Sequence, residues 1–224
     1  MLDRQQSVAT VVLDHSECAA VFQRHRIDFC CRGDLSVDAA ATAKGVATEE
    51  LLEELERVIL ERHGNRESDP RALSTPELVT HIVATHHDYL RRALPMVGAL
   101  AAKVGRVHGD RNPKLRELAP VVETLVGTLL EHLDEEEETL FPALLGAQDG
   151  GAPLEAQLAS MTEDHLDVAA LLERIRLASD DFTPPEWACT SYRTLFAELA
   201  HAERDIFAHV HLENHVLAPR FASR

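Results

Sequence analysis

The sequence predicts an all-α protein, an antiparallel bundle of four long helices preceded by a small N-terminal helical domain. The 224 residues are rich in Ala, Leu and Glu, which favour helices, and aromatic residues make up only 4%. Long stretches repeat their apolar residues in steps of three and four, which is the period of one side of a helix. Capping and turn residues divide these stretches into four.

The N-terminal segment is predicted to contain short helices. Ser36 caps one that ends at Gly45, and Thr48 caps an acidic helix that ends at Gly64. The polar stretch 64–74 contains Gly and Pro and is typical of a linker. We therefore expect three parts: a small helical cysteine-pair domain (1–65), a linker (66–75) and a four-helix bundle (76–224).

Three of the four long helices of the bundle begin at a recognisable signal. Thr75-Pro76 and Asn112-Pro113 each place proline in the first helical position, and the segment 183–186, Thr-Pro-Pro-Glu, adds a capping box. Pro95 and Pro120 lie inside two of the helices and are expected to bend them. The predicted helices are 76–104, 113–145, 153–178 and 184–220.

One apolar stripe runs along each long helix, and we call it the seam of that helix. Six ionisable residues interrupt the four seams, and burying them unpaired would be very costly. His86 competes with His87, because a one-residue rotation of that helix would exchange them. The six seam residues are His87, His132, Glu136, His165, His209 and Glu213. The other nine histidines are expected on the surface or hydrogen-bonded beside these six.

The bundle contains an internal repeat. The segment 132–142, HLDEEEETLFP, matches the segment 209–219, HVHLENHVLAP, at an offset of 77 residues. A single seam histidine, His87 or His165, precedes each segment by 45 or 44 residues. The bundle therefore consists of two similar helix pairs, each contributing His plus His-x-x-x-Glu.

These residue types suit a pair of transition-metal ions. The i, i+4 spacing places a histidine and a glutamate one turn apart on the same side of a helix. Imidazole binds Fe, Zn, Cu and Ni, and carboxylates that bridge two cations favour a dinuclear site. Iron is the leading choice, since a structural zinc site would more often include thiolates. Glu137 or Asp164 could accept a hydrogen bond from a ligand histidine.

The chain has four cysteines, of which Cys30 and Cys31 are adjacent. They are either two free thiols at a helix end or a redox-responsive or metal-touching pair, with thiolate character increased by Arg32. Cys18 and Cys189 are expected to be packing residues.

Charge and hydropathy exclude several classes of partner. Lys and Arg total 22 against 38 Asp and Glu, for a net charge of −16, so nucleic acid and anionic membrane surfaces are not expected as partners. No apolar run reaches the roughly 18 residues of a membrane span, and the first residues do not resemble a signal peptide. We expect a cytoplasmic protein.

With these motifs, the sequence resembles the hemerythrin-like di-iron proteins that repair iron–sulfur clusters, the repair-of-iron-centres family. The segment 27–40, IDFCCRGDLSVDAA, is similar to the cysteine-pair domain of that family, although Arg32 replaces the first glycine of its usual Cys-Cys-Gly-Gly core. The bundle segments that resemble the family are 86–95, 103–110, 132–142, 161–169, 183–196 and 209–220.

The resemblance implies a hemerythrin-like bundle with an oxo- or hydroxo-bridged centre of two iron ions. The family's ligands fall on the same six seam residues: His87, His132, Glu136, His165, His209 and Glu213. Cys30 and Cys31 become candidate redox or iron-transfer thiols.

The function implied by the resemblance is repair of iron–sulfur clusters damaged by oxidative or nitrosative stress, by supplying iron to the damaged proteins. Two alternatives stay open: a di-iron oxidoreductase that reduces nitric oxide, and a hemerythrin-like sensor or carrier of O₂, NO or metal. A purely structural bundle is a further alternative. O₂ or NO is the expected small ligand, and a homodimer is left open.

Overall fold

The computed structural model describes residues 2–61, 69–146 and 152–221. The predicted helix end at Gly64 and the first residues of the predicted linker lie outside these ranges. Within them the regular elements are helical, apart from one isolated bridge between Ser7 and Ser36, so the prediction of an all-α protein is confirmed. No helix in the described ranges combines the length and the apolar character that crossing a membrane requires.

The chain forms two compact units. The first comprises Met1–Ser74 together with Val210–Pro219, and the second comprises Thr75–His209 together with Arg220–Arg224. The first unit contains α1 (Val8–Asp14), α2 (Cys18–Arg24), α3 (Val37–Lys44), α4 (Thr48–Glu61) and a 3₁₀ turn (Pro70–Ala72).

Helix α3 has the predicted ends. The Ser36 hydroxyl accepts a hydrogen bond from Ala39 N, and Gly45 closes the helix in the left-handed conformation at φ 69°. At the start of α4, the Thr48 hydroxyl instead donates to the Asp38 carboxylate at 2.9 Å. This bond joins the beginnings of α3 and α4.

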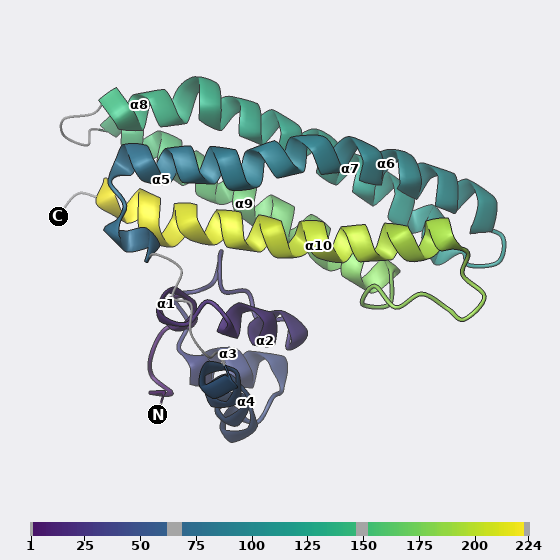
Figure 1. The fold of residues 1–224 in the computed structure, drawn as a ribbon, viewed down its shortest axis with the longest axis horizontal. Coiled ribbons are helices and arrows are strands. Elements are labelled where there is room, and N and C mark those ends of the chain that lie inside the picture. Colours follow the sequence, from purple (N-terminus) through teal and green to yellow (C-terminus); the bar gives the residue numbers. More distant parts are fainter. Residues whose placement is uncertain (1, 62–68, 147–151, 222–224) are drawn as a thin grey trace. The chain divides into compact units, whose positions relative to one another are not determined.

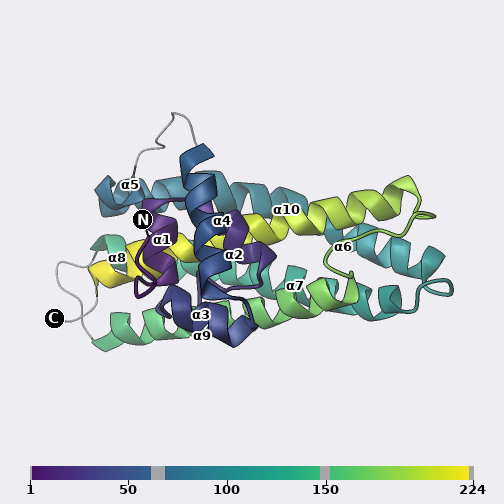
Figure 2. The same cartoon turned by 90° about the horizontal axis from the view of Figure 1, so that it is seen from below.

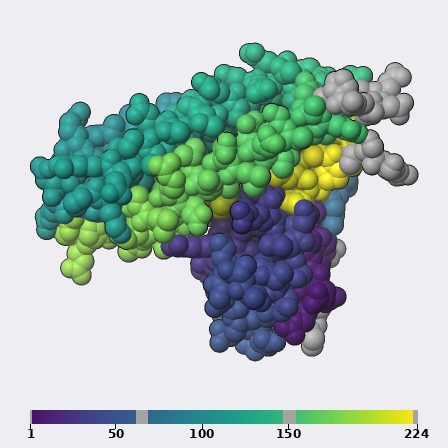
Figure 3. All heavy atoms as spheres, turned by 180° about the vertical axis from the view of Figure 1, so that it is seen from behind, coloured from purple at the N-terminus to yellow at the C-terminus, as the bar shows by residue number. Residues whose placement is uncertain are grey.

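The second unit is built on long helical segments that run side by side (Figures 1 and 2). Helix α7 packs against both α6 and α9, and Figure 3 shows side chains of α9, in green, lying along those of α7, in teal. The elements are α5 (Thr75–Ile82), α6 (Asp88–His108), α7 (Lys114–Glu135), α8 (Phe141–Gly146), α9 (Ala152–Ala178) and α10 (Thr190–Leu212).

The fourth long helix starts later than predicted, at Thr190. The predicted capping box at Thr183 fails because two consecutive prolines follow it. Pro184 would be the first residue of the helix, but a residue that precedes proline is pushed away from helical dihedrals. The chain instead makes a turn in which Ala188 N donates to Pro185 O at 2.9 Å.

Helices α6 and α7 continue through Pro95 and Pro120, and the bends expected there stay a prediction. The structure shows another irregularity, a π-helical turn within three of the long segments. These turns are η2 (Val83–His87) between α5 and α6, η3 (Glu136–Leu140) between α7 and α8, and η4 (Glu213–Leu217) after α10. A π turn inserts one extra residue into a helix and often marks a functional site.

Candidate metal centre

The six seam residues are all buried, and three of them lie in the π turns. His87 ends η2, Glu136 begins η3 and Glu213 begins η4. Among the six, the most exposed residue is His132, at 5%, and His87, His209 and Glu213 are at 0%. Such complete burial of ionisable groups requires partners of opposite charge or metal ions.

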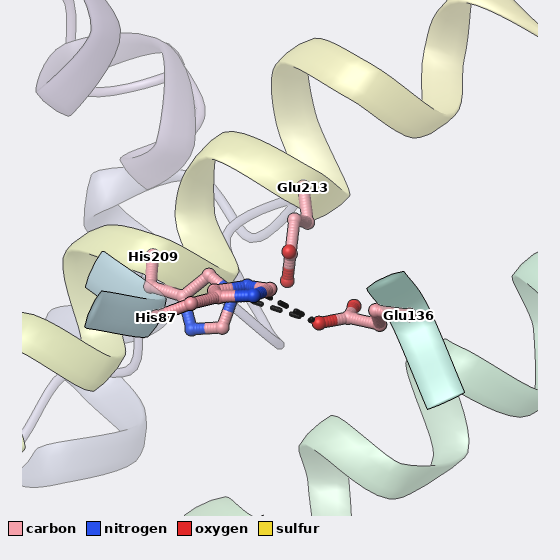
Figure 4. Close-up of side chains that lie close together, drawn as sticks. All are labelled: His87, Glu136, His209 and Glu213. Carbon is pink, nitrogen blue, oxygen red and sulfur yellow. Dashed lines mark hydrogen bonds and ion pairs between the residues drawn. The ribbon is translucent and has the colours of Figure 1, made fainter. Parts of the chain in front are cut away.

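The structure brings all six residues together in two overlapping groups of potential ligands. One group is His87, Glu136, His209 and Glu213, and the other is His132, Glu136, His165 and Glu213. Within each group the ligand atoms lie within 4.8 Å of one another. Figure 4 shows the first group, with both glutamates directed toward the two imidazole rings. Glu136 and Glu213 belong to both groups, so the two groups share both carboxylates.

The spacing of the imidazole nitrogens fits metal coordination. The Nε2 atoms of His87 and His209 are 3.1 Å apart, and those of His132 and His165 are also 3.1 Å apart. Two nitrogens bound to one ion at about 2.1 Å and at a right angle would be about 3.0 Å apart. Each histidine pair is therefore arranged as neighbouring ligands of one ion.

The surroundings of the Glu136 carboxylate indicate independently that a cation would fit at this site. Its oxygens are fully buried and have no hydrogen-bond partner in the described part of the chain. Oε1 is 3.3 Å from His132 Nε2, and Oε2 is 3.5 Å from His87 Nε2. A buried carboxylate surrounded by imidazole nitrogens, without hydrogen bonds of its own, suits direct coordination of a cation.

Glu137 fixes the orientation of one ligand ring. His87 Nδ1 is 2.9 Å from Glu137 Oε1, and Arg91 Nη2 donates to the same oxygen at 2.9 Å. Burial raises the pKa of Glu137, but the hydrogen bonds with Arg91 and His87 outweigh it and hold this pKa below its usual value. The carboxylate can thus accept a hydrogen bond from the Nδ1–H group of His87, which leaves the Nε2 atom available to bind a metal ion. Asp164 is less close to His132, at 3.7 Å from Nδ1.

Replacing Glu137 by glutamine is expected to weaken metal binding by about 10- to 100-fold, because the His87 ring loses its charged hydrogen-bond acceptor. The dissociation constant can be measured by competition with a metal chelator. The control is Glu138→Gln, which removes an equal charge from the exposed neighbouring residue. Equal affinities of the two variants would contradict a positioning role for Glu137.

His86 lies outside both ligand groups, although it is buried. Its Nδ1 is 3.0 Å from Asp205 Oδ1, and its ring stacks on that of His209 at 5.8 Å. Sequence reasoning missed Asp205, which lies one helical turn before His209 and could have been found by that spacing. It also missed the burial of His211, whose pKa is lowered to about 4 by burial and by the nearby His215.

A cavity of about 240 Å³ borders one half of the cluster. Its lining includes His132 and Glu136 from the cluster and Met161 and Asp164 from α9. A diatomic molecule fits a cavity of this size, and the cavity reaches the half of the cluster that contains His132.

The cysteine pair forms a separate third group with Asp28. The Sγ atoms of Cys30 and Cys31 are 3.6 Å apart, and Asp28 Oδ1 accepts the backbone N–H of both residues. Burial, followed by the hydrogen bond with Cys31, raises the pKa of the Cys30 thiol. The expectation of increased thiolate character is therefore wrong for Cys30, because burial disfavours the charged form of this thiol.

Position 33 requires glycine, whereas position 32 does not. A Cβ at Gly33 would collide with the Phe29 carbonyl oxygen and lie 2.6 Å from Ala9 Cβ. Arg32 is exposed and meets no such restriction. The departure from Cys-Cys-Gly-Gly thus falls at the position where the backbone tolerates a side chain.

Within the first unit, hydrogen bonds also join the cysteine loop to the π turn η4. The Cys30 carbonyl oxygen accepts hydrogen bonds from His215 Nε2 at 2.7 Å and from Asn214 Nδ2 at 3.1 Å. Both donors belong to η4, the π turn that begins with Glu213. The cysteine loop is therefore anchored to the segment that carries one of the two shared glutamates.

Comparisons with known proteins agree with this architecture. Residues 78–221 match the hemerythrin HHE cation binding domain, and residues 4–59 match a domain of unknown function, DUF542, also called ScdA_N. The iron–sulfur cluster repair protein ScdA of Staphylococcus haemolyticus is 32% identical and aligns with 99% of this chain and all of its own length. The iron–sulfur cluster repair protein YtfE of Enterobacter sp. strain 638 is 31% identical over 98% of both chains. This chain therefore belongs to the ScdA and YtfE family of iron–sulfur cluster repair proteins, in which a hemerythrin cation-binding domain follows a DUF542 domain.

Proposed function

We propose that this protein supplies iron to iron–sulfur clusters damaged by oxidative or nitrosative stress. The observation that carries the proposal is the sharing of Glu136 and Glu213 between two buried ligand groups. Two carboxylates placed between two histidine pairs form a site for two metal ions, and iron fits this mixture of imidazole and carboxylate ligands. The names of the ScdA and YtfE relatives support repair as the purpose of the site.

Each half of the proposed centre has the same composition. His87 and His209 would hold one iron ion, His132 and His165 the other, and the two shared glutamates would bridge them. Bound iron would provide both the metal to be transferred and redox chemistry toward O₂ or NO. In the metal-bound state, the cations would offset the charge of the two buried carboxylates.

The proposed partners are damaged iron–sulfur proteins in the cytoplasm. Cys30 and Cys31 are proposed to take part in transfer of iron or electrons, since their sulfur atoms and Asp28 form a second potential metal-binding group. We propose that residues 1–65 act as this thiol domain and that residues 76–224 hold the iron, with 66–75 as the linker.

Reduction of nitric oxide at the same centre is a second candidate. The cavity of about 240 Å³ beside His132 and Glu136 supports it, because a diatomic molecule could enter there. Reduction of NO would consume electrons in every turnover, whereas iron donation to an oxidised three-iron cluster would consume one electron for each ferrous ion inserted.

The two candidates can be separated with a purified hydratase whose [4Fe–4S] cluster has lost one iron ion. The full chain, loaded with ferrous iron under anaerobic conditions and supplied with a reductant, is expected to restore the hydratase activity while losing its own iron. The metal-free chain with the same reductant is the control. Failure to restore activity, together with steady-state consumption of NO in the presence of a reductant, would reject iron donation in favour of NO reduction.

A further inference from the structure

A cysteine–histidine pair lies outside the ligand cluster, in the second unit. Cys189 immediately precedes α10 and is exposed, contrary to the expectation that it is a packing residue. His108 is the last residue of α6, and its Nε2 atom is 3.1 Å from Cys189 Sγ. An imidazole at this distance can accept the thiol proton and leave a thiolate, the nucleophilic form of cysteine.

Aromatic neighbours hold the imidazole in place. The His108 ring stacks on Tyr192 with a centroid distance of 5.8 Å and lies 5.9 Å from the Trp187 ring. The Tyr192 hydroxyl accepts a hydrogen bond from Asn112 Nδ2 at 2.8 Å, which fixes the ring in turn. Packing against two aromatic rings therefore orients the imidazole beside the thiol.

Cys189 also stands at the start of α10. Its carbonyl oxygen accepts the Arg193 N–H at 3.0 Å, so Cys189 caps the N-terminal end of a helix of 23 residues. The N-terminal end of a long helix carries partial positive charge, which stabilises a thiolate. Exposure, a neighbouring base and a helix N-terminus thus coincide at one sulfur atom.

We propose that Cys189 is a site of reversible modification that forms a mixed disulfide with a low-molecular-weight disulfide, assisted by His108. The His108 imidazole takes the proton of the Cys189 thiol, and the thiolate attacks one sulfur of the disulfide. The bond between the two reagent sulfurs breaks as the new one forms. The departing thiolate takes the proton back from His108, so the reagent disulfide is reduced and the protein thiol oxidised in balance.

The other thiols are less suited to this exchange. Cys18 and Cys30 are buried, and burial raises the pKa of Cys18 to about 12. Burial also raises the pKa of Cys30. Cys31 is partly exposed and could react as well. The reaction therefore has to be measured separately at each cysteine.

The test uses the full chain and glutathione disulfide at pH 7, with peptide-resolved mass spectrometry. Cys189 is expected to react about tenfold faster than the same cysteine in a synthetic peptide of residues 186–193. His108→Gln is expected to remove most of this advantage. The control is His201→Gln, which alters another exposed histidine that contacts a tyrosine, Tyr89.

Two results would overturn the proposal. One is that Cys189 in the intact chain reacts with glutathione disulfide no faster than the cysteine of the peptide. This result alone would overturn the proposal, without any variant. The other is an equal rate in His108→Gln and His201→Gln, with helix content unchanged by circular dichroism. Either result would show that Cys189 has the reactivity of an ordinary exposed thiol.

Discussion

The double variant Glu136→Gln, Glu213→Gln is expected to lose most of its bound metal, falling from about two ions per chain toward none. Both carboxylates belong to both ligand groups, so the change removes the only negative ligands that the two groups share. A neutral amide cannot offset two divalent cations in a buried site. Metal content is measured by mass spectrometry of the purified protein.

The matched control is Glu135→Gln, Glu138→Gln, which makes the same charge change at two exposed positions of the second long helix. It is expected to keep its full metal content. If the variant at Glu136 and Glu213 bound as much metal as this control, the two glutamates would not be ligands, and a structural bundle would be the better account.

Arg176→Ala is expected to destabilise the bundle by about 3–5 kcal/mol. Arg176 Nε donates to Glu203 Oε1 at 2.9 Å, and Nη2 contacts the other oxygen, in a fork that spans α9 and α10. Glu203 is only 2% exposed. Removing the guanidinium would leave a buried carboxylate without its cation, which costs more than the pair itself contributes.

This loss corresponds to a fall in melting temperature of roughly 6–20 °C for a protein of this size. Arg174→Ala, which changes an exposed arginine on the same helix, is the control and is expected to shift the melting temperature little. Equal melting temperatures for the two variants would show that the Arg176–Glu203 pair does not stabilise the fold.

The sequence predicts most of the fold because helix formation here depends on local signals. Local residues alone identify the caps at Ser36 and Gly45 and the break before Lys114. The start of the last helix could not be placed, because the capping pattern at Thr183 competes with the restrictions imposed by two prolines.

The π turns limit what a periodic pattern can show. A seam continued at helical period through η3 predicts burial of Thr139 and Ala143, but the structure buries Leu140 and Leu144. The extra residue of the turn shifts the buried side by one position. A regular helical repeat does not indicate where a π turn adds a residue. The shift of the buried side is seen only in the packed structure.

The six cluster residues could be found from the sequence because they are repeated. A single His-x-x-x-Glu is common on helix surfaces, whereas two copies at an offset of 77 residues on buried seams are not. The supporting residues Asp205 and Arg91 do not belong to the repeat. Their roles depend on contacts between helices, to His86 and to Glu137, which a single sequence does not specify.

The central claim is that this chain holds two iron ions in one buried centre. Metal analysis combined with Mössbauer spectroscopy, on protein purified without oxygen, tests it most directly. The account predicts about two iron ions per chain in a paired site with nitrogen and oxygen ligands. Zinc alone, or a single metal ion per chain, would contradict it.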